Sequence, residues 1–269
     1  MDPSGSIEEP VLGVQGERPA AVVARLRAWI AAAPAYPANA GDLRSFEALG
    51  LRLPIRATIA IVAVTLIMLL DYHGRIADIF TAILGEPATA ADLKRIQSIG
   101  RLVMLGIVPL LVVVLAMRDR PSRYGVAIGD WRTGLALGVG GCLVMTPVVL
   151  AIARVPAFAA YYAPQATAPA GVVLTTALEV IPAEFFFRGF LMFTLLRVIG
   201  PVAVLVATLP FAFAHLGKPE VETLSTVAGG LAYGWLDWRT GSVLWAGLAH
   251  TWILSLVVIA AGATGPPGA

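Results

Sequence analysis

Long apolar stretches separated by short polar segments fill the chain from residue 55 onward. Each stretch approaches or exceeds the roughly 20 residues with which an α-helix crosses the hydrocarbon core of a bilayer. They lie at 55–72, 99–117, 133–153, 170–196, 200–216, 222–237 and 241–261. This pattern predicts an all-α fold, a polytopic transmembrane helix bundle of about seven spans.

The first 54 residues follow a different pattern, with many charged residues and prolines. They begin without an apolar h-region, so we expect no signal peptide. The stretch 22–33 has the spacing of an amphipathic helix, which suits either the membrane surface or a soluble helix, and a Pro- and Gly-containing linker follows it. We therefore expect a cytoplasmic N-terminal segment at 1–54, a transmembrane domain at 55–261 with its core motifs in 170–260, and a tail at 262–269.

Composition narrows the class of protein. Charged residues make up 13% of the chain and hydrophobic residues 58%, with a mean hydropathy of +0.82. A soluble domain carries about 25% charged residues, so a soluble enzyme and a disordered protein are both excluded. The net charge of +2 gives no basic field, and we expect no nucleic-acid partner. Cys142 is the single cysteine, so neither an internal disulfide nor a Cys-rich metal site is expected.

Arginine positions predict the orientation in the membrane. Loops rich in Lys and Arg stay on the cytoplasmic side, and four arginines crowd the loop 118–132. Counting spans from this loop places the N-terminus in the cytoplasm and the C-terminus outside. The loop 73–98 carries three cations on the expected outer side, which opposes this orientation. The excess of arginine over lysine and the abundant alanine suggest a bacterial gene, hence a multi-pass protein of the bacterial inner membrane.

Ionisable residues inside the apolar spans are the candidates for chemistry: Glu179, Glu184 and Arg188 in the fourth span, His215 in the fifth and His250 in the last. A charge in a membrane helix costs several kcal/mol unless it is paired or faces water. Glu184 and Arg188 are one helical turn apart and can pair, and a histidine beside a buried carboxylate can polarise water. We expect all five in one polar pocket. The alternative is that the Glu184–Arg188 pair only locks the bundle and each histidine only packs.

These residues also carry a resemblance to a known family, over about residues 120–260. The chain has Glu184…Arg188-Gly189-Phe-Leu, then Phe211…His215, then His250. This order resembles the CPBP family of intramembrane proteases (CAAX prenyl proteases and bacteriocin-processing enzymes, also called the Abi family), with its motifs Glu-Glu-x-x-x-Arg, Phe-x-x-x-His and His-x-x-x-Asn/Asp. The resemblance implies a glutamate-type endopeptidase that cleaves a peptide or a hydrophobic C-terminal tail with activated water. A subgroup similar to the myxosortases fits.

Two positions depart from the family pattern. Ala183 stands where the family has the glutamate that activates water, and Leu254 stands where it has Asn or Asp. Glu179 lies one turn from position 183, about 6 Å along the helix, and Glu184 is its direct neighbour. We expect Glu179 to be unpaired and to act as the base, with Glu184 holding Arg188. Glu184 itself is the alternative base. The resemblance makes the two histidines position the water and stabilise the oxyanion.

Other functions are compatible with the same residues. Ala183 and Leu254 favour a catalytically inactive CPBP-like protein that binds membrane peptides or confers immunity. A proton-coupled transporter also uses intramembrane Glu and His, but no inverted repeat is visible. We expect no cofactor. If a metal is present, zinc on His215, His250 and Glu184 is the alternative. The expected partners are a protein or peptide substrate within the membrane and the lipid bilayer itself.

Overall fold

The computed structural model describes residues 21, 23, 24, 28 and 34–264. The chain divides into two units, Met1–Ala33 and Pro34–Ala269, and the account below concerns the second. Most of the amphipathic stretch expected at 22–33 and most of the tail expected at 262–269 lie outside the described residues. The boundary expected after residue 54 falls inside the second unit.

The second unit is a bundle of helices with one small hairpin. Its helices are α2 (Ala40–Leu43), α3 (Ile55–Tyr72), α4 (Arg75–Leu84), α5 (Ala90–Arg101), α6 (Val108–Leu111), α7 (Trp131–Ile152), α8 (Pro156–Tyr162), α9 (Pro169–Glu184), α10 (Phe193–Ile199), α11 (Val202–Phe213), α12 (Glu220–Thr240) and α13 (Leu244–Thr264). The π-helical segments η1 (Leu102–Ile107), η2 (Val112–Ala116) and η5 (Phe185–Met192) continue helices, and the 3₁₀ segments η3 (Pro121–Tyr124) and η4 (Ala163–Gln165) lie in connections. Strands β1 (Ser45–Ala48) and β2 (Leu51–Pro54) pair antiparallel, with Ser45 opposite Pro54.

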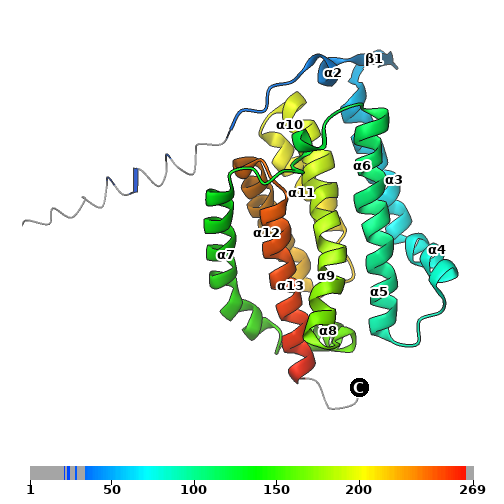
Figure 1. Ribbon diagram of the computed structural model, residues 1–269, viewed down its shortest axis with the longest axis vertical. Helices are drawn as coiled ribbons and strands as arrows, with labels where there is room; N and C mark the ends of the chain where they lie inside the picture. The colour runs from blue at the N-terminus through cyan, green and yellow to red at the C-terminus, as the bar shows by residue number, and fades with distance from the viewer. Residues whose placement is uncertain (1–20, 22, 25–27, 29–33, 265–269) are drawn as a thin grey trace, which may run out of the picture. The chain divides into compact units, whose positions relative to one another are not determined.

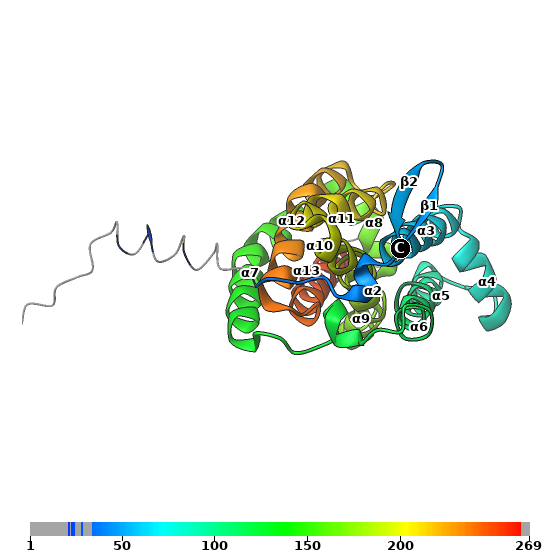
Figure 2. The same cartoon turned by 90° about the horizontal axis from the view of Figure 1, so that it is seen from above.

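The long helices run side by side (Figure 1). In both views α13 lies between α7 and α9, and it packs against each of them (Figure 2). The hairpin, α2 and α10 lie at one end of the bundle, whereas α8 and the last turn of α13 lie at the other. The fold predicted from the sequence, an all-α polytopic bundle, is confirmed.

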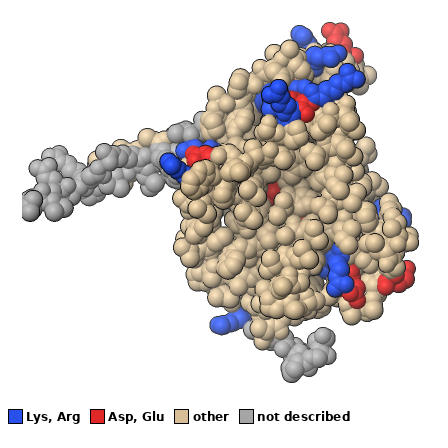
Figure 3. Space-filling model, viewed as in Figure 1, with Lys and Arg blue, Asp and Glu red and all other residues tan. Residues whose placement is uncertain are grey.

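Within the described part of the chain, five helices are long and apolar enough to cross a membrane, namely Ile55–Tyr72, Ala90–Ala116, Trp131–Ile152, Pro169–Ile199 and Leu244–Ala263. The other two expected spans correspond to α11, which is apolar but only 12 residues long, and to α12, which has 21 residues and a more polar sequence. The count of about seven spans therefore stays a prediction. Charged side chains gather toward the two ends of the face drawn in Figure 3 and leave a broad, nearly uncharged band between them, as a membrane protein requires.

One end of the bundle is tied together by a buried carboxylate. Asp42 in α2 is 1% exposed and forms ion pairs with Arg56 of α3 at 2.9 Å, with Arg123 of η3 at 2.7 Å and with Arg197 of α10 at 3.3 Å. Three guanidinium groups from separate elements thus converge on one side chain. This network holds the segment after residue 34 against the transmembrane helices.

The Asp42 network should make the fold sensitive to acid. Burial raises the pKa of the Asp42 carboxyl, but hydrogen bonds from the Asn39 backbone and from two of these guanidinium groups outweigh burial and hold the pKa at about 2, below the usual 3.8. A lowered pKa stabilises the fold above about pH 4, and this stabilisation is lost as the pH falls toward 2. We expect Asp42→Asn to cost about 3 kcal/mol at neutral pH and to remove this acid-dependent step. Thermal unfolding in detergent between pH 6 and pH 2 measures both; equal pH profiles for the two proteins would contradict the assignment.

Candidate active site

A buried carboxylate forms the centre of the site. Glu184 is the last residue of α9 and is 0% exposed, and Arg188 in η5 is 1% exposed. Arg188 Nη1 lies 3.1 Å from Glu184 Oε2, so the two residues pair as the sequence predicts. The other carboxylate oxygen, Oε1, lies 2.7 Å from Nδ1 of His250 in α13. Glu184 therefore joins α13 to the junction of α9 and η5, and π-helical turns of this kind often occur at functional sites.

One ring nitrogen of His250 is hydrogen-bonded to Glu184, and the other is available to accept a proton. An ionised carboxylate can only accept hydrogen bonds, so Nδ1–H of His250 donates to Glu184. The imidazole stacks on Tyr233 at 5.1 Å and meets the edge of Phe211 at 6.0 Å. These contacts fix the tautomer and the ring plane. Nε2 is then the nitrogen that remains free to accept a proton.

His215 is oriented by the residue one turn before it. His215 is 7% exposed, and its Nδ1–H donates to the Phe211 carbonyl at 2.8 Å, so Nε2 is an acceptor with no hydrogen-bond partner among the described residues. The centroid of the Phe211 ring lies 4.7 Å from that of the His215 ring. The guanidinium carbon of Arg188 lies 3.8 Å from the centroid of the same Phe211 ring. The spacing Phe-x-x-x-His thus has a physical role, because its first residue fixes the histidine and also covers Arg188.

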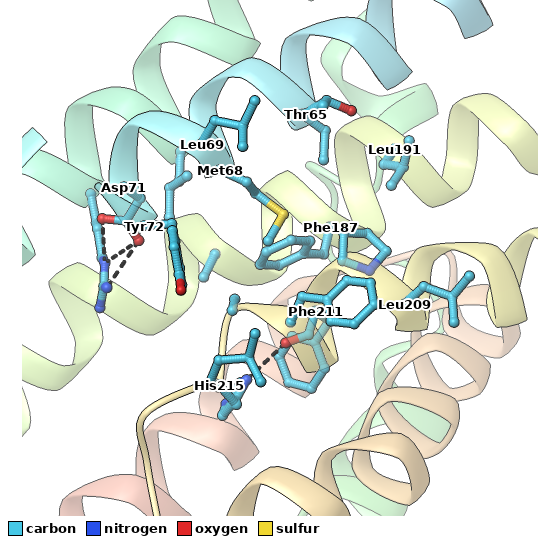
Figure 4. A pocket seen from close by; sticks show the side chains of 18 of the residues that line it. Thr65, Met68, Leu69, Asp71, Tyr72, Phe187, Leu191, Leu209, Phe211 and His215 are labelled. Atoms are coloured by element: carbon cyan, nitrogen blue, oxygen red, sulfur yellow. Dashed lines mark hydrogen bonds and ion pairs between the residues drawn. The ribbon is translucent and has the colours of Figure 1, made fainter. Parts of the chain in front are cut away.

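A cavity of about 690 Å³ opens beside these groups, between α3, η1, α9, η5, α11 and α13. Glu179, His215 and His250 are among its lining residues, and most of the remaining wall is apolar. Figure 4 shows Phe211, His215, Phe187 and Met68 around it. Glu184 and Arg188 do not line the cavity and lie fully buried behind it. Three of the five predicted residues thus face the cavity, and the other two support His250 from behind.

The expectation that Glu179 is unpaired is wrong. Lys94 Nζ lies 2.6 Å from its Oε2, and Arg101 Nη1 contacts its Oε1. Arg101 also pairs with Asp71 at 3.0 Å. Both cations belong to α5, which begins at Ala90, nine residues before the predicted span. Lys94 lies in a stretch that the hydropathy pattern predicts to be a loop, and this stretch is instead part of the helix that also carries Arg101.

Comparison with known families adds one finding. Residues 164–255, about a third of the chain, match the family model described as type II CAAX prenyl endopeptidase Rce1-like. This segment is Rce1-like. The resemblance to the CPBP/CAAX family of intramembrane proteases is thereby confirmed, and the matched segment spans α9 through most of α13, including all five candidate residues. No curated protein and no solved structure matches the chain significantly.

Both departures from the CPBP motifs lie in the cavity wall. Ala183 and Leu254 are among its lining residues. A glutamate at 183 and an amide at 254 would therefore project toward the same space that the histidines face. In this CPBP-like site the wall has a methyl group and an isobutyl group at these positions instead.

Sequence reasoning missed a further buried carboxylate near the site, Asp237 of α12. It is 0% exposed, and the backbone amide of Ala246 in α13 interacts with its carboxyl group. The charges that act on it are those of Glu184 and Arg188. One signal was available, since Asp237 lies within the apolar stretch expected at 222–237 and any acid in such a stretch is a functional candidate.

The geometry does not favour the alternative zinc set. Among the described residues, no group of three or more His, Cys, Asp or Glu is arranged to hold a metal ion. Glu184 meets His250 through Nδ1, on the opposite side of the ring from Nε2. A carboxylate in that place supports a histidine rather than sharing a ligand position with it. His215, His250 and Glu184 therefore do not present three donors to one point.

Proposed function

We propose that the protein is an intramembrane endopeptidase that cleaves a peptide, or the hydrophobic tail of a protein, with water activated by the Glu184–His250 pair. The observation that carries this proposal is the 2.7 Å hydrogen bond from Nδ1 of a cavity-lining histidine to a fully buried carboxylate. A base oriented by a carboxylate is the usual arrangement for proton removal from a nucleophile. The Rce1-like segment supports peptide hydrolysis as the reaction class.

The residues have distinct parts in this reaction. Nε2 of His250 takes a proton from water as the water oxygen attacks the scissile carbonyl carbon. Glu184 stabilises the resulting imidazolium, and Arg188 keeps Glu184 ionised and in place. The imidazolium then gives its proton to the leaving amine as the C–N bond breaks. The free Nε2 of His215 holds the water from a second direction.

The developing oxyanion needs positive charge, and Leu254 supplies no donor. Arg101 and Lys218 are the cations that line the cavity. Glu179 and Asp71 hold Arg101 there. We assign Glu179 to positioning Arg101, because a carboxylate already paired with two cations is a poor base. One missing oxyanion donor costs about 2.7–4 kcal/mol of transition-state stabilisation, which a nearby guanidinium can offset in part.

The competing function is an inactive peptide-binding protein, which Ala183 and Leu254 favour. Purified wild type, Ala183→Glu, Leu254→Asn and the double variant, each assayed on membrane peptides by mass spectrometry, separate the two functions. We expect the wild type to cleave, and Leu254→Asn to accelerate cleavage because it adds a donor to the cavity wall. Cleavage by the double variant alone would show that the natural chain is an inactive binding protein.

A further inference from the structure

The cavity reaches only one of the two polar ends of the bundle. Its lining includes Asp71 and Tyr72, in the last turn of α3, and Lys218, in the connection between α11 and α12. Arg56, in the first turn of α3, belongs to the Asp42 network at the other end and is not part of the lining. Fifteen residues of helix separate Arg56 from Asp71, which is about 22 Å. The ionic part of the cavity lining and the Asp42 network thus lie most of a bilayer's hydrocarbon thickness apart.

The end that contains the Asp42 network holds most of the arginines. It is held together by the pairs of Asp42, by the hydrogen bond of Asp130 N–H to the Thr240 carbonyl and by that of Val243 N–H to Gly125. The arginines of the elements that meet there are Arg44, Arg52, Arg56, Arg118, Arg120, Arg123, Arg132, Arg197 and Arg239. We call this the arginine end. Figure 3 shows blue atoms gathered there beside the hairpin and α2.

The cavity end holds fewer cations in its loops. Its Lys and Arg residues are Arg75, Lys94, Arg95, Arg101, Arg154 and Lys218. Lys94 and Arg101 point inward to Glu179, and Lys218 pairs with Glu222 at 2.9 Å beside the cavity. Arg101 and Lys218 line the cavity, and Lys94 pairs with the lining residue Glu179, so none of the three is a free loop charge. The cations of 73–98 that opposed the predicted orientation are thus partly explained as site residues.

Loops with more Lys and Arg face the cytoplasm. We propose that the arginine end is cytoplasmic and that the cavity opens to the outer side of the membrane, so that the substrate is a membrane-anchored protein cut in a translocated segment next to its apolar anchor. The substrate part of this proposal rests on the proposed function, whereas the direction in which the cavity opens does not. The cavity wall fits such a segment, because it is apolar along α3 and α11 and ionic where Asp71, Arg101 and Lys218 line it.

Site-specific labelling tests the direction. In a Cys142→Ala background, single cysteines are placed at the exposed positions Glu86 and Thr167 of the cavity end, and at Leu49 and Ser122 of the arginine end. Spheroplasts of bacteria that produce each variant are treated with a membrane-impermeant maleimide, with and without permeabilisation. Labelling after permeabilisation, measured for every variant, serves as the control for access.

We expect Glu86→Cys and Thr167→Cys to react in intact spheroplasts, and Leu49→Cys and Ser122→Cys to react only after permeabilisation. The reverse pattern, or equal labelling of both ends in intact spheroplasts, would overturn the inference. Because labelling does not depend on catalysis, the two proposals fail separately. Reversed labelling with peptide cleavage refutes the outward opening alone, whereas the expected labelling without cleavage refutes the endopeptidase alone.

Discussion

Glu184→Gln is expected to lower the cleavage rate by about 10³- to 10⁴-fold, the loss that follows when the carboxylate behind a catalytic histidine becomes an amide. Glutamine keeps the size of the side chain and can still accept from His250, but it cannot stabilise an imidazolium. The same change leaves Arg188, which is 1% exposed, without its partner. Removing one member of a buried ion pair costs about 3 to 5 kcal/mol. Activity and thermal stability in detergent should therefore fall together.

A double variant separates the two effects. Glu184→Gln with Arg188→Met removes both buried charges, so we expect it to recover much of the stability while remaining inactive. Glu179→Gln is the matched control on the same helix and should cause a smaller loss, because Arg101 keeps its pair with Asp71. Cleavage that survives in Glu184→Gln but disappears in Glu179→Gln would assign the base to Glu179.

His250→Phe is expected to abolish detectable cleavage with a smaller loss of stability than Glu184→Gln causes. Phenylalanine preserves an aromatic ring against Tyr233 and Phe211, and Glu184 keeps Arg188 as its partner. Loss of a general base lowers rates by about 10²- to 10⁴-fold. Peptide cleavage followed by mass spectrometry, together with thermal unfolding, measures both quantities.

The control for this variant is His73→Phe, at an exposed position outside the cavity. It should cleave like the wild type. If His250→Phe retained the activity of His73→Phe, the imidazole of His250 would not be the proton acceptor.

Apolar length predicts the helices of this protein well where they contact lipid. The expected span 55–72 coincides with α3, because no charged residue interrupts its sequence between Arg56 and Asp71. Apolar length predicts the start of α5 poorly. That helix begins in a polar stretch, where the Thr89 hydroxyl caps the backbone N–H of Asp92 at 3.1 Å, and local capping does not change the hydropathy pattern.

The motif residues were predictable as a group, and their detailed partners were not. Glu184 and Arg188 are close in sequence, so their pair follows from helical spacing. Arg101 lies 78 residues before Glu179, and no local pattern relates the two. The preference for Glu179 as the base depended on that missing contact. Tertiary packing, rather than helix periodicity, therefore decides which glutamate supports the histidine.

The central claim, that this protein cuts membrane proteins with Glu184 and His250, is tested most directly by mass spectrometry of the C-termini of membrane proteins in cells. Three strains are compared: one lacking the gene, one carrying the wild type and one carrying Glu184→Gln at equal protein level. We predict new C-termini with the wild type and none of them in the other two strains. Identical C-termini in all three strains, or the same new termini with Glu184→Gln as with the wild type, would contradict the claim.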